Sequence, residues 1–190
     1  MRSALRNRYY LVRHGQSEAN VVGIIVSSPH NGVGRFGLSP LGRDQVRTTA
    51  LPSELGPQAI VYASDFLRAR ETAEIIAERL GAGTPMLTPA LRERDFGTWE
   101  LTSTENYAQV WAADERGGSQ DHDRVETAGH VAERVQGLVA QIEETHDGAG
   151  VVLVSHGDTL QILQAVLSGI DPALHRSLPH LETAEVRPVP

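Results

Sequence analysis

The sequence predicts an α/β fold, a three-layer sandwich in which helices cover both faces of a mostly parallel central sheet. Short apolar runs alternate along the chain with longer stretches of helical periodicity. The clearest strand, residues 151–154, is apolar at every position, as expected where a parallel sheet is covered on both faces. A chain of 190 residues, of which 40% are hydrophobic, fits one domain spanning residues 1–190.

The first strand and the first helix are separated by a long polar segment. Residues 9–12 form a short apolar run and are predicted to be a buried strand. Residues 26–38, rich in glycine, serine, asparagine and proline, are expected to form a loop near the mouth of a site. Ser39 then caps a helix that has Pro40 at its first position and runs to about residue 50.

A second strand and helix follow in the same order. Residues 60–63 are predicted to be a buried strand, and residues 86–87 a weak one. Ser64 or Asp65 is expected to cap the intervening helix, and Gly81 to end it. The apolar face of this helix recurs at spacings of three and four residues, through Phe66, Ala69, Ala73, Ile76 and Leu80.

The second half of the chain is predicted to hold a long helix, a strong strand and a closing helix. Thr127 caps the long helix and Gly148 closes it, with Val131, Val135, Leu138 and Ile142 on its apolar face. The strand at 151–154 leads into a helix over residues 158–167. Three weaker elements complete the prediction: a short helix over 103–111, an irregular segment over 116–124 and a last edge strand over 183–189.

Polar residues follow three of the predicted strands. Arg13 and His14 follow the first, residues 64–68 the second and residues 155–156 the last. Because the carboxyl ends of parallel strands meet at one edge of a sheet, these residues should converge. A histidine can attack phosphorus, and a neighbouring guanidinium can hold phosphoryl oxygens. Gly15 lets the backbone turn sharply and approach a ligand. The pattern predicts a site for a phosphoryl group.

Four sequence blocks resemble, in the same order, those of the histidine phosphatase superfamily, phosphoglycerate-mutase-like branch. They are Arg13-His14-Gly15 with Asn20, residues 64–73, residues 91–100 and Ser155-His156-Gly157. The resemblance covers residues 9–167 and implies the phosphoglycerate-mutase-like sandwich. It also implies an enzyme, a phosphatase that hydrolyses a phosphate monoester through a phosphohistidine intermediate on His14. The substrate implied is a small phosphorylated metabolite.

The resemblance assigns the phosphoryl centre residue by residue. It makes His14 the nucleophile, and it makes Arg13, Arg68 and His156 the groups that hold the phosphoryl oxygens. Arg70 competes with Arg68 for the second arginine, but Arg68 stands immediately before the alanine where the family pattern has it. These donors stabilise charge on the migrating group, which is most of what catalysis of phosphoryl transfer requires.

The resemblance makes Glu93 the proton donor to the leaving oxygen and then the base for water. The family has its acid two residues after the leucine that corresponds to Leu91. Asp95, Glu100 and Asp158 are alternatives, and Asp158 is otherwise expected to cap the last helix. Burial would have to raise the pKa of Glu93 toward neutrality for it to act as an acid.

Three further residues are expected to contact the substrate. Asn20 can donate a neutral hydrogen bond to the phosphoryl oxygens, although an asparagine there can also be a helix cap. Gly157 follows the second histidine, and Gln16 stands where the family usually has glutamate. The change at Gln16 leaves the substrate-facing loop less certain than the phosphoryl centre.

Composition excludes several other chemistries. The chain has no cysteine and no lysine, so thiolate zinc sites, cysteine nucleophiles and Walker lysines are absent. The formal net charge of -7 disfavours a nucleic-acid partner, and no apolar run is long enough for a membrane span. We expect no cofactor and no metal, with Asp121-His122-Asp123 interpreted as a solvated loop. The apolar run before Arg13 is too short for a signal peptide, so a cytoplasmic protein is expected.

Other functions remain open at this point. A cofactor-dependent phosphoglycerate mutase is the first alternative, and the acidic balance of residues 97–127 disfavours its anionic substrate. A protein phosphatase acting on phosphohistidine or phosphoserine, or a non-catalytic module that binds phosphoesters, is the second. The partner expected is a small-molecule phosphoester. The oligomeric state is undetermined, with a homodimer as one option.

Overall fold

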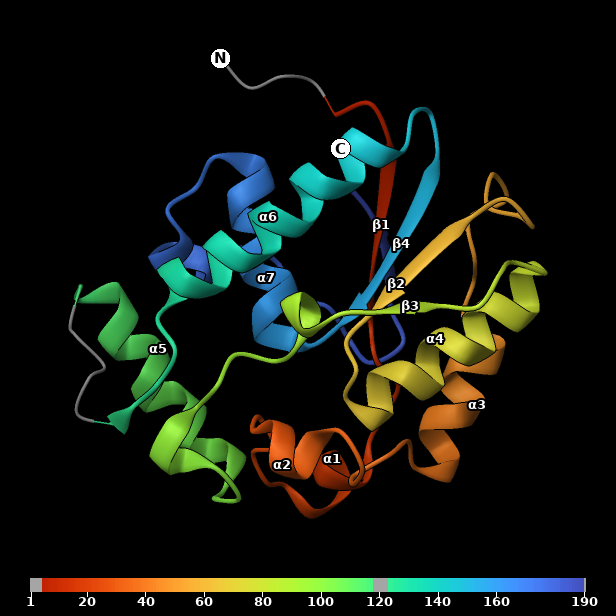
Figure 1. Cartoon of the computed structure of the whole chain (residues 1–190). Helices are drawn as coiled ribbons and strands as arrows, with labels where there is room; N and C mark the ends of the chain where they lie inside the picture. Colours follow the sequence, from red (N-terminus) through yellow and green to blue (C-terminus); the bar gives the residue numbers. More distant parts are fainter. Residues whose placement is uncertain (1–4, 118–122, 190) are drawn as a thin grey trace.

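The computed structural model describes residues 5–117 and 123–189, and the Asp121-His122-Asp123 hypothesis therefore lies mostly outside it. Within these ranges one sheet has the strand order β3-β2-β4-β1-β5 (Figure 1). All neighbours run parallel except β5, which pairs antiparallel with β1 at one edge. The strands are β1 (Arg8–Arg13), β2 (Ile60–Ala63), β3 (Met86–Leu87), β4 (Gly150–Ser155) and β5 (Val186–Pro188).

Alternate residues of the two central strands face opposite layers of helices, because successive side chains of a strand point to opposite faces. Tyr9 and Leu11 of β1 pack with buried residues of α6 (Ala128–Thr145) and α7 (Gly157–Ser168). Tyr10 and Val12 pack with buried residues of α3 (Pro40–Thr48) and α4 (Leu67–Leu80). Figure 1 shows these two pairs of helices on opposite sides of the sheet. The predicted three-layer α/β fold is confirmed.

The strand register brings the predicted polar residues to one edge of the sheet. Arg13 at the end of β1 lies opposite Ser155 at the end of β4. The amide of His14 donates to the carbonyl of Ser155 at 3.0 Å. The amide of Ser64 donates to the carbonyl of Val154, also at 3.0 Å. The ends of β1, β2 and β4 are therefore held together by backbone hydrogen bonds.

Two of the predicted helix N-caps are confirmed, and the one predicted for α4 differs. Ser39 caps α3 by accepting from the amide of Gly42, and Thr127 caps α6 by accepting from that of His130. The helix α4 begins at Leu67, with Phe66 rather than Ser64 or Asp65 at the N-cap position. The polar residues there have other partners. The Ser64 hydroxyl contacts His156, and Asp65 forms a bidentate ion pair with Arg92.

Several element ends also differ from the prediction. The helix α6 ends at Thr145 with His146 as C-cap, before Gly148, and β5 is shorter than residues 183–189. The short helix α2 (Pro29–Gly32) forms within residues 26–38, where the sequence predicted a loop, and a second short helix, α1 (Glu18–Val22), precedes it. Single turns complete the part of the chain that is described: η1 (Pro89–Leu91), η2 (Gly97–Trp99), η3 (Thr104–Asn106) and η5 (Pro172–Ser177).

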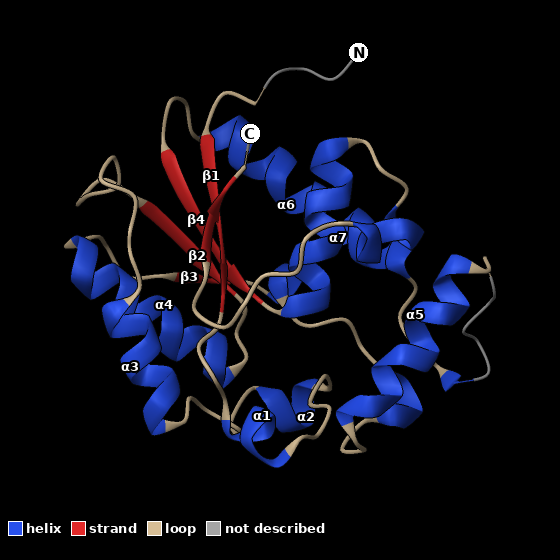
Figure 2. Ribbon diagram, turned by 180° about the vertical axis from the view of Figure 1, so that it is seen from behind, coloured by secondary structure: helices blue, strands red, loops and turns tan. Residues whose placement is uncertain are grey.

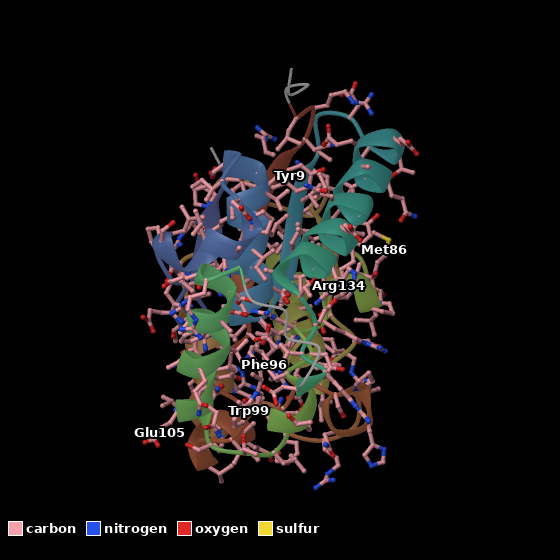
Figure 3. The ribbon with its side chains drawn as sticks, turned by 90° about the vertical axis from the view of Figure 1, so that its left-hand side faces the viewer. Tyr9, Met86, Phe96, Trp99, Glu105 and Arg134 are labelled. Carbon is pink, nitrogen blue, oxygen red and sulfur yellow. The ribbon has the colours of Figure 1, made fainter. Side chains whose placement is uncertain are left out.

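The segment around α5 (Tyr107–Glu115) has a small apolar core of its own. Ile25, Phe96, Val110 and Val125 are buried together, with Trp99 and Tyr107 packed against them. Figure 2 shows α5 standing apart from the sheet, and in Figure 3 Trp99 lies toward the opposite end of the molecule from Tyr9. None of the helices described is long and apolar enough to cross a membrane.

Candidate active site

His14 lies at the end of β1 and is 3% exposed. Its Nδ1 is 2.7 Å from the carbonyl oxygen of Gly15, and its Nε2 is 3.1 Å from Nε of Arg68. A carbonyl only accepts and a guanidinium only donates, so Nδ1 carries the proton and Nε2 is unprotonated, its lone pair accepting from Nε of Arg68. Burial, followed by the charges of Arg68 and Arg13, lowers the pKa of His14 well below its ordinary value. The imidazole is therefore neutral and nucleophilic at Nε2.

The turn after His14 requires the glycine that the sequence has there. A Cβ on Gly15 would lie 2.5 Å from the carbonyl oxygen of Gly42 and 2.8 Å from a methyl of Val46. No side chain fits in that space, because α3 packs directly against the turn. The amide of Gly15 donates to the hydroxyl of Thr72 on α4 at 3.2 Å, which fixes the turn against the second helix of the same layer.

Three buried donors around His14 have no hydrogen-bond partner among the residues described. They are Nε of Arg13, NH1 of Arg68 and Nδ1 of His156. The neighbouring atoms hold each side chain in place: NH1 of Arg13 donates to the carbonyl of Leu181 at 2.8 Å, and NH2 of Arg68 to that of Val26 at 2.8 Å.

His156 completes the group from the end of β4. Its ring centroid lies 5.1 Å from that of His14, and its Nε2 is 2.9 Å from the Ser64 hydroxyl. That hydroxyl accepts from the amide of Phe66, and Nε2 is the acceptor available for its own proton among the residues described, so the proton of His156 is on Nδ1, which is a donor. Buried donors without partners are rare in folded proteins, and a cluster of them is suited to the oxygens of an anion.

Glu93 stands beside this cluster with one oxygen fixed. Its Oε1 accepts from the amide of Arg94 at 2.9 Å and from the amide and hydroxyl of Thr159, each at 3.2 Å. Burial, together with the charge of Asp158, raises the pKa of Glu93. A carboxyl group with a raised pKa can give a proton to a leaving oxygen.

Asp158 has neither of the roles that the sequence suggested, a proton donor or the cap of the last helix. His156, not Asp158, is at the N-cap position of α7. Burial disfavours ionisation of Asp158, but the hydrogen bond from His175 and the charge of Arg94 outweigh it and lower its pKa to about 2. Trp111 also donates to it at 2.8 Å. Asp158 is thus an ionised, fully engaged carboxylate rather than a proton donor.

The other alternative residues lie outside the cluster. Oδ1 of Asp95 accepts from the amide of Gly97 at 2.8 Å. Oε2 of Glu100 accepts from the amides of Ser27 and Ser28 at 2.7 and 3.1 Å, so both acids hold loops in place. The side chain of Arg70 is 38% exposed on α4, and no contact brings it to His14.

Two of the residues predicted to bind substrate also have structural partners. Oδ1 of Asn20 accepts from the amide of Ser17 at 3.0 Å, in a capping box at the start of α1. Oε1 of Gln16 accepts from the Ser39 hydroxyl at 2.7 Å, which ties the turn after β1 to α3. Gly157 begins α7 beside the site, where a Cβ would lie 3.6 Å from Cζ of Arg13.

The model of the histidine phosphatase superfamily, branch 1, matches residues 9–189. The chain belongs to this family. An adenosylcobalamin/alpha-ribazole phosphatase of Salmonella typhimurium is 30% identical over 169 residues, covering 84% of this chain and 79% of the relative. A probable phosphoglycerate mutase, GpmB, of an Enterobacter species is 30% identical over 175 residues, covering 89% and 78%.

Solved structures of the family have the same fold. A mycobacterial glucosyl-3-phosphoglycerate phosphatase in complex with VO3 superposes with a TM-score of 0.78 at 28% identity, covering 95% of this chain and 90% of the other. This histidine phosphatase is an enzyme of the phosphoric monoester hydrolase type, like the phosphatases among these relatives.

A cavity of about 200 Å³ adjoins the phosphoryl cluster of this histidine phosphatase. Arg13 and Glu93 line one side of it, so it is the space next to the proposed proton donor. Its remaining walls come from Tyr107, Trp111, Gly157, Asp158, Arg176 and His180. We call it the leaving-group cavity.

Four of the residues that line the leaving-group cavity were absent from the predicted site: Tyr107, Trp111, Arg176 and His180. The aromatic residues belong to α5 and the other two to the C-terminal segment, outside the four matching blocks. An aromatic residue on a helix is indistinguishable by pattern from a core residue, so no local signal marked these positions.

The acidic balance of residues 97–127 does not produce a negative cavity wall. Glu100 is bound to loop amides, Asp114 is paired with Arg94 at 2.6 Å and Glu126 is paired with Arg134 at 2.8 Å. The segment contributes aromatic side chains to the leaving-group cavity. A count of charges along the sequence does not show that these acids are engaged, because their partners lie outside the segment. These three acids therefore give no argument against an anionic substrate.

Proposed function

We propose that this enzyme is a phosphatase that hydrolyses a small phosphate monoester through a phosphohistidine at Nε2 of His14. The observation that carries the proposal is the neutral imidazole with an unprotonated Nε2, beside donors of Arg13, Arg68 and His156 that have no partner among the residues described. A nucleophile with a fixed tautomer, next to donors for three phosphoryl oxygens, has the arrangement that phosphoryl transfer requires.

The proposed reaction has two steps. Nε2 of His14 forms a bond to phosphorus while the ester oxygen leaves and takes the proton of Glu93. Glu93, now a carboxylate, then accepts a proton from a water molecule that attacks the phosphohistidine. This second step breaks the N–P bond, releases inorganic phosphate and restores both side chains. The charges of Arg13 and Arg68 stabilise the phosphoryl oxygens in both steps.

Water access to Glu93 supports hydrolysis over retention of the phosphoryl group. A second, wider cavity of about 500 Å³ is also lined by Glu93, but not by Arg13. Its walls include the polar residues Arg92, Asp95, Glu126 and Arg134. A cavity of this size with polar groups next to the general base can admit the attacking water.

The substrate class is supported by the relatives. They include phosphatases named for alpha-ribazole, for phosphoserine and for glucosyl-3-phosphoglycerate. We therefore infer a small phosphorylated metabolite as substrate. Phosphoglycerate mutase activity is the second candidate, favoured by the similarity to the probable mutases GpmB, which reaches 31% identity.

The test is trapping of the phosphoenzyme. Wild-type enzyme quenched during turnover of 4-nitrophenyl phosphate should carry one acid-labile, base-stable phosphoryl group, and His14→Ala should carry none. Activity of His14→Ala should fall by more than the roughly 10²–10³-fold that loss of a single stabilising donor costs. His130→Gln, a change at an exposed histidine of α6, serves as the control. Retention of more than about 1% activity by His14→Ala would exclude His14 as the nucleophile.

A further inference from the structure

His180 lines the leaving-group cavity and carries a donor that the reaction above does not use. NH1 of Arg13 lies 2.6 Å from Nε2 of His180 and can only donate, so Nε2 accepts. Burial, followed by the charge of Arg13, lowers the pKa of His180, so the ring is neutral and its proton is on Nδ1. Nδ1 is buried and has no hydrogen-bond partner within residues 5–117 and 123–189.

Arg176 brings a fixed positive charge to the same cavity. Its Cζ lies 3.7 Å from the ring centroid of Trp111, close enough for a cation–π contact. Its NH1 donates to Oε1 of Gln161, whereas Nε and NH2 have no partner among the residues described. The guanidinium is therefore held in place with donors to spare.

The acids that line the cavity do not use these donors. Both oxygens of Asp158 are occupied, Oδ1 by Trp111 and His175 and Oδ2 by Arg94. Oε1 of Glu93 is bound to backbone and hydroxyl groups, and burial, together with the charge of Asp158, raises the pKa of its carboxyl and so disfavours its charged form. The other acid whose charge raises the pKa of His180 is Glu182, which is exposed to solvent.

We infer that Arg176 and His180 form a second anion subsite, which selects phosphomonoesters whose leaving group carries a carboxylate. This inference rests on the proposed function. The cavity volume of about 200 Å³ lies below the ~300–1,000 Å³ of sites for drug-sized ligands. The leaving group is therefore a small hydroxy acid rather than a sugar or a nucleoside. Arg176 and His180 are specificity-determining residues for this reaction.

The test compares substrates that differ only at the anionic group. 3-Phosphoglycerate and glycerol 3-phosphate share a skeleton, with a carboxylate in one where the other has a hydroxymethyl group. We expect wild-type kcat/KM to favour 3-phosphoglycerate by about tenfold or more, the usual worth of a hydrogen bond to a charged group. Arg176→Gln should reduce that ratio by about tenfold to a hundredfold, and Arg47→Gln, an exposed arginine on α3, should leave it unchanged.

His180→Gln separates the two contacts of His180. The glutamine oxygen can accept from Arg13 as Nε2 does, but no donor replaces Nδ1–H. The selectivity for 3-phosphoglycerate should fall in this variant too. Equal loss of kcat/KM on both substrates in Arg176→Gln, or no preference in the wild type, would overturn the inference. A preference for fructose 1,6-bisphosphate over 3-phosphoglycerate would overturn the carboxylate assignment.

Ligand binding to the His14→Ala variant tests the anion subsite independently of the proposed phosphatase activity. The Kd of 3-phosphoglycerate and of glycerol 3-phosphate can be measured calorimetrically in this variant without turnover. Tighter binding of the carboxylate compound, by about tenfold, supports the subsite even if the wild type hydrolyses no ester. Hydrolysis of 4-nitrophenyl phosphate together with equal Kd values would reject the subsite and retain the phosphatase.

Discussion

Replacing Glu93 with glutamine should remove proton transfer while leaving the site intact. Oε1 of Glu93 accepts three hydrogen bonds from Arg94 and Thr159, so the glutamine carbonyl should take that position. The amide nitrogen then occupies the position of Oε2, facing the leaving oxygen. It can donate a hydrogen bond but cannot give up a proton at neutral pH. The variant therefore isolates general acid catalysis from binding.

The expected loss depends on the leaving group. General acid catalysis contributes about 10²–10⁴-fold, or roughly 2.7–5.5 kcal/mol of barrier, for an alkyl phosphate whose oxygen must be protonated. An aryl oxide leaves readily without a proton, so kcat/KM for 4-nitrophenyl phosphate should fall by less than about tenfold. The second step still needs Glu93 as a base, so the aryl substrate should phosphorylate the enzyme and stall there.

Stopped-flow absorbance of 4-nitrophenol gives a clear assay. Glu93→Gln should release a burst of one equivalent per enzyme and then turn over slowly, whereas kcat/KM on glycerol 3-phosphate should collapse. Asp95→Asn and Glu100→Gln, the other acids of the same block, should show neither effect. Equal losses of kcat/KM on the two substrates, without a burst, would refute Glu93 as the general acid and point to another carboxyl group.

Three further outcomes are expected. Release of phosphate should exceed interconversion of 3- and 2-phosphoglycerate, even with 2,3-bisphosphoglycerate supplied; interconversion faster by about tenfold, or ~1.4 kcal/mol in barrier height, would establish the mutase instead. Arg94→Met leaves Asp114 and Asp158 without their buried cation, so urea unfolding should show a loss of about 3–5 kcal/mol, and a loss below ~1 kcal/mol would contradict this account. His14 and His156 stay neutral in the folded protein but bind protons in the unfolded chain below about pH 6.5. As the pH is lowered below that value, the free energy of unfolding should therefore decrease by ~1.4 kcal/mol per pH unit for each histidine. The His14→Ala variant should lack the contribution of one histidine to this pH dependence.

The part of the site that lies on strand ends could be predicted from the sequence. Apolar runs located β1, β2 and β4, and parallel pairing then required Arg13, His14 and His156 to meet. Geometry that depends on contacts remote in the chain could not be predicted. Arg13 and His180 are 167 positions apart, and nothing in the residues around His180 distinguishes it from a surface histidine.

Two local rules failed because the site uses the residues concerned. Serine is a favoured helix cap, but the Ser64 hydroxyl orients His156, and α4 begins later at Leu67. An arginine in a polar block is normally exposed, yet the side chain of Arg94 is 0% exposed and pairs with Asp114 and Asp158. Propensity describes a residue in an average setting, and both residues here are in a setting made by tertiary contacts.

The separate apolar core beneath α5 has a consequence for how this enzyme can diversify. Ile25, Phe96, Val110 and Val125 support the wall that carries Tyr107 and Trp111, and none of the four belongs to the clusters that pack on the sheet. Substitutions in that wall can therefore be absorbed locally, without moving the strand ends that carry the nucleophile. In the course of evolution, one leaving group can therefore be exchanged for another while the phosphoryl chemistry stays constant. Relatives named for alpha-ribazole, phosphoserine and a glucosylated phosphoglycerate are consistent with such independent change of the two parts.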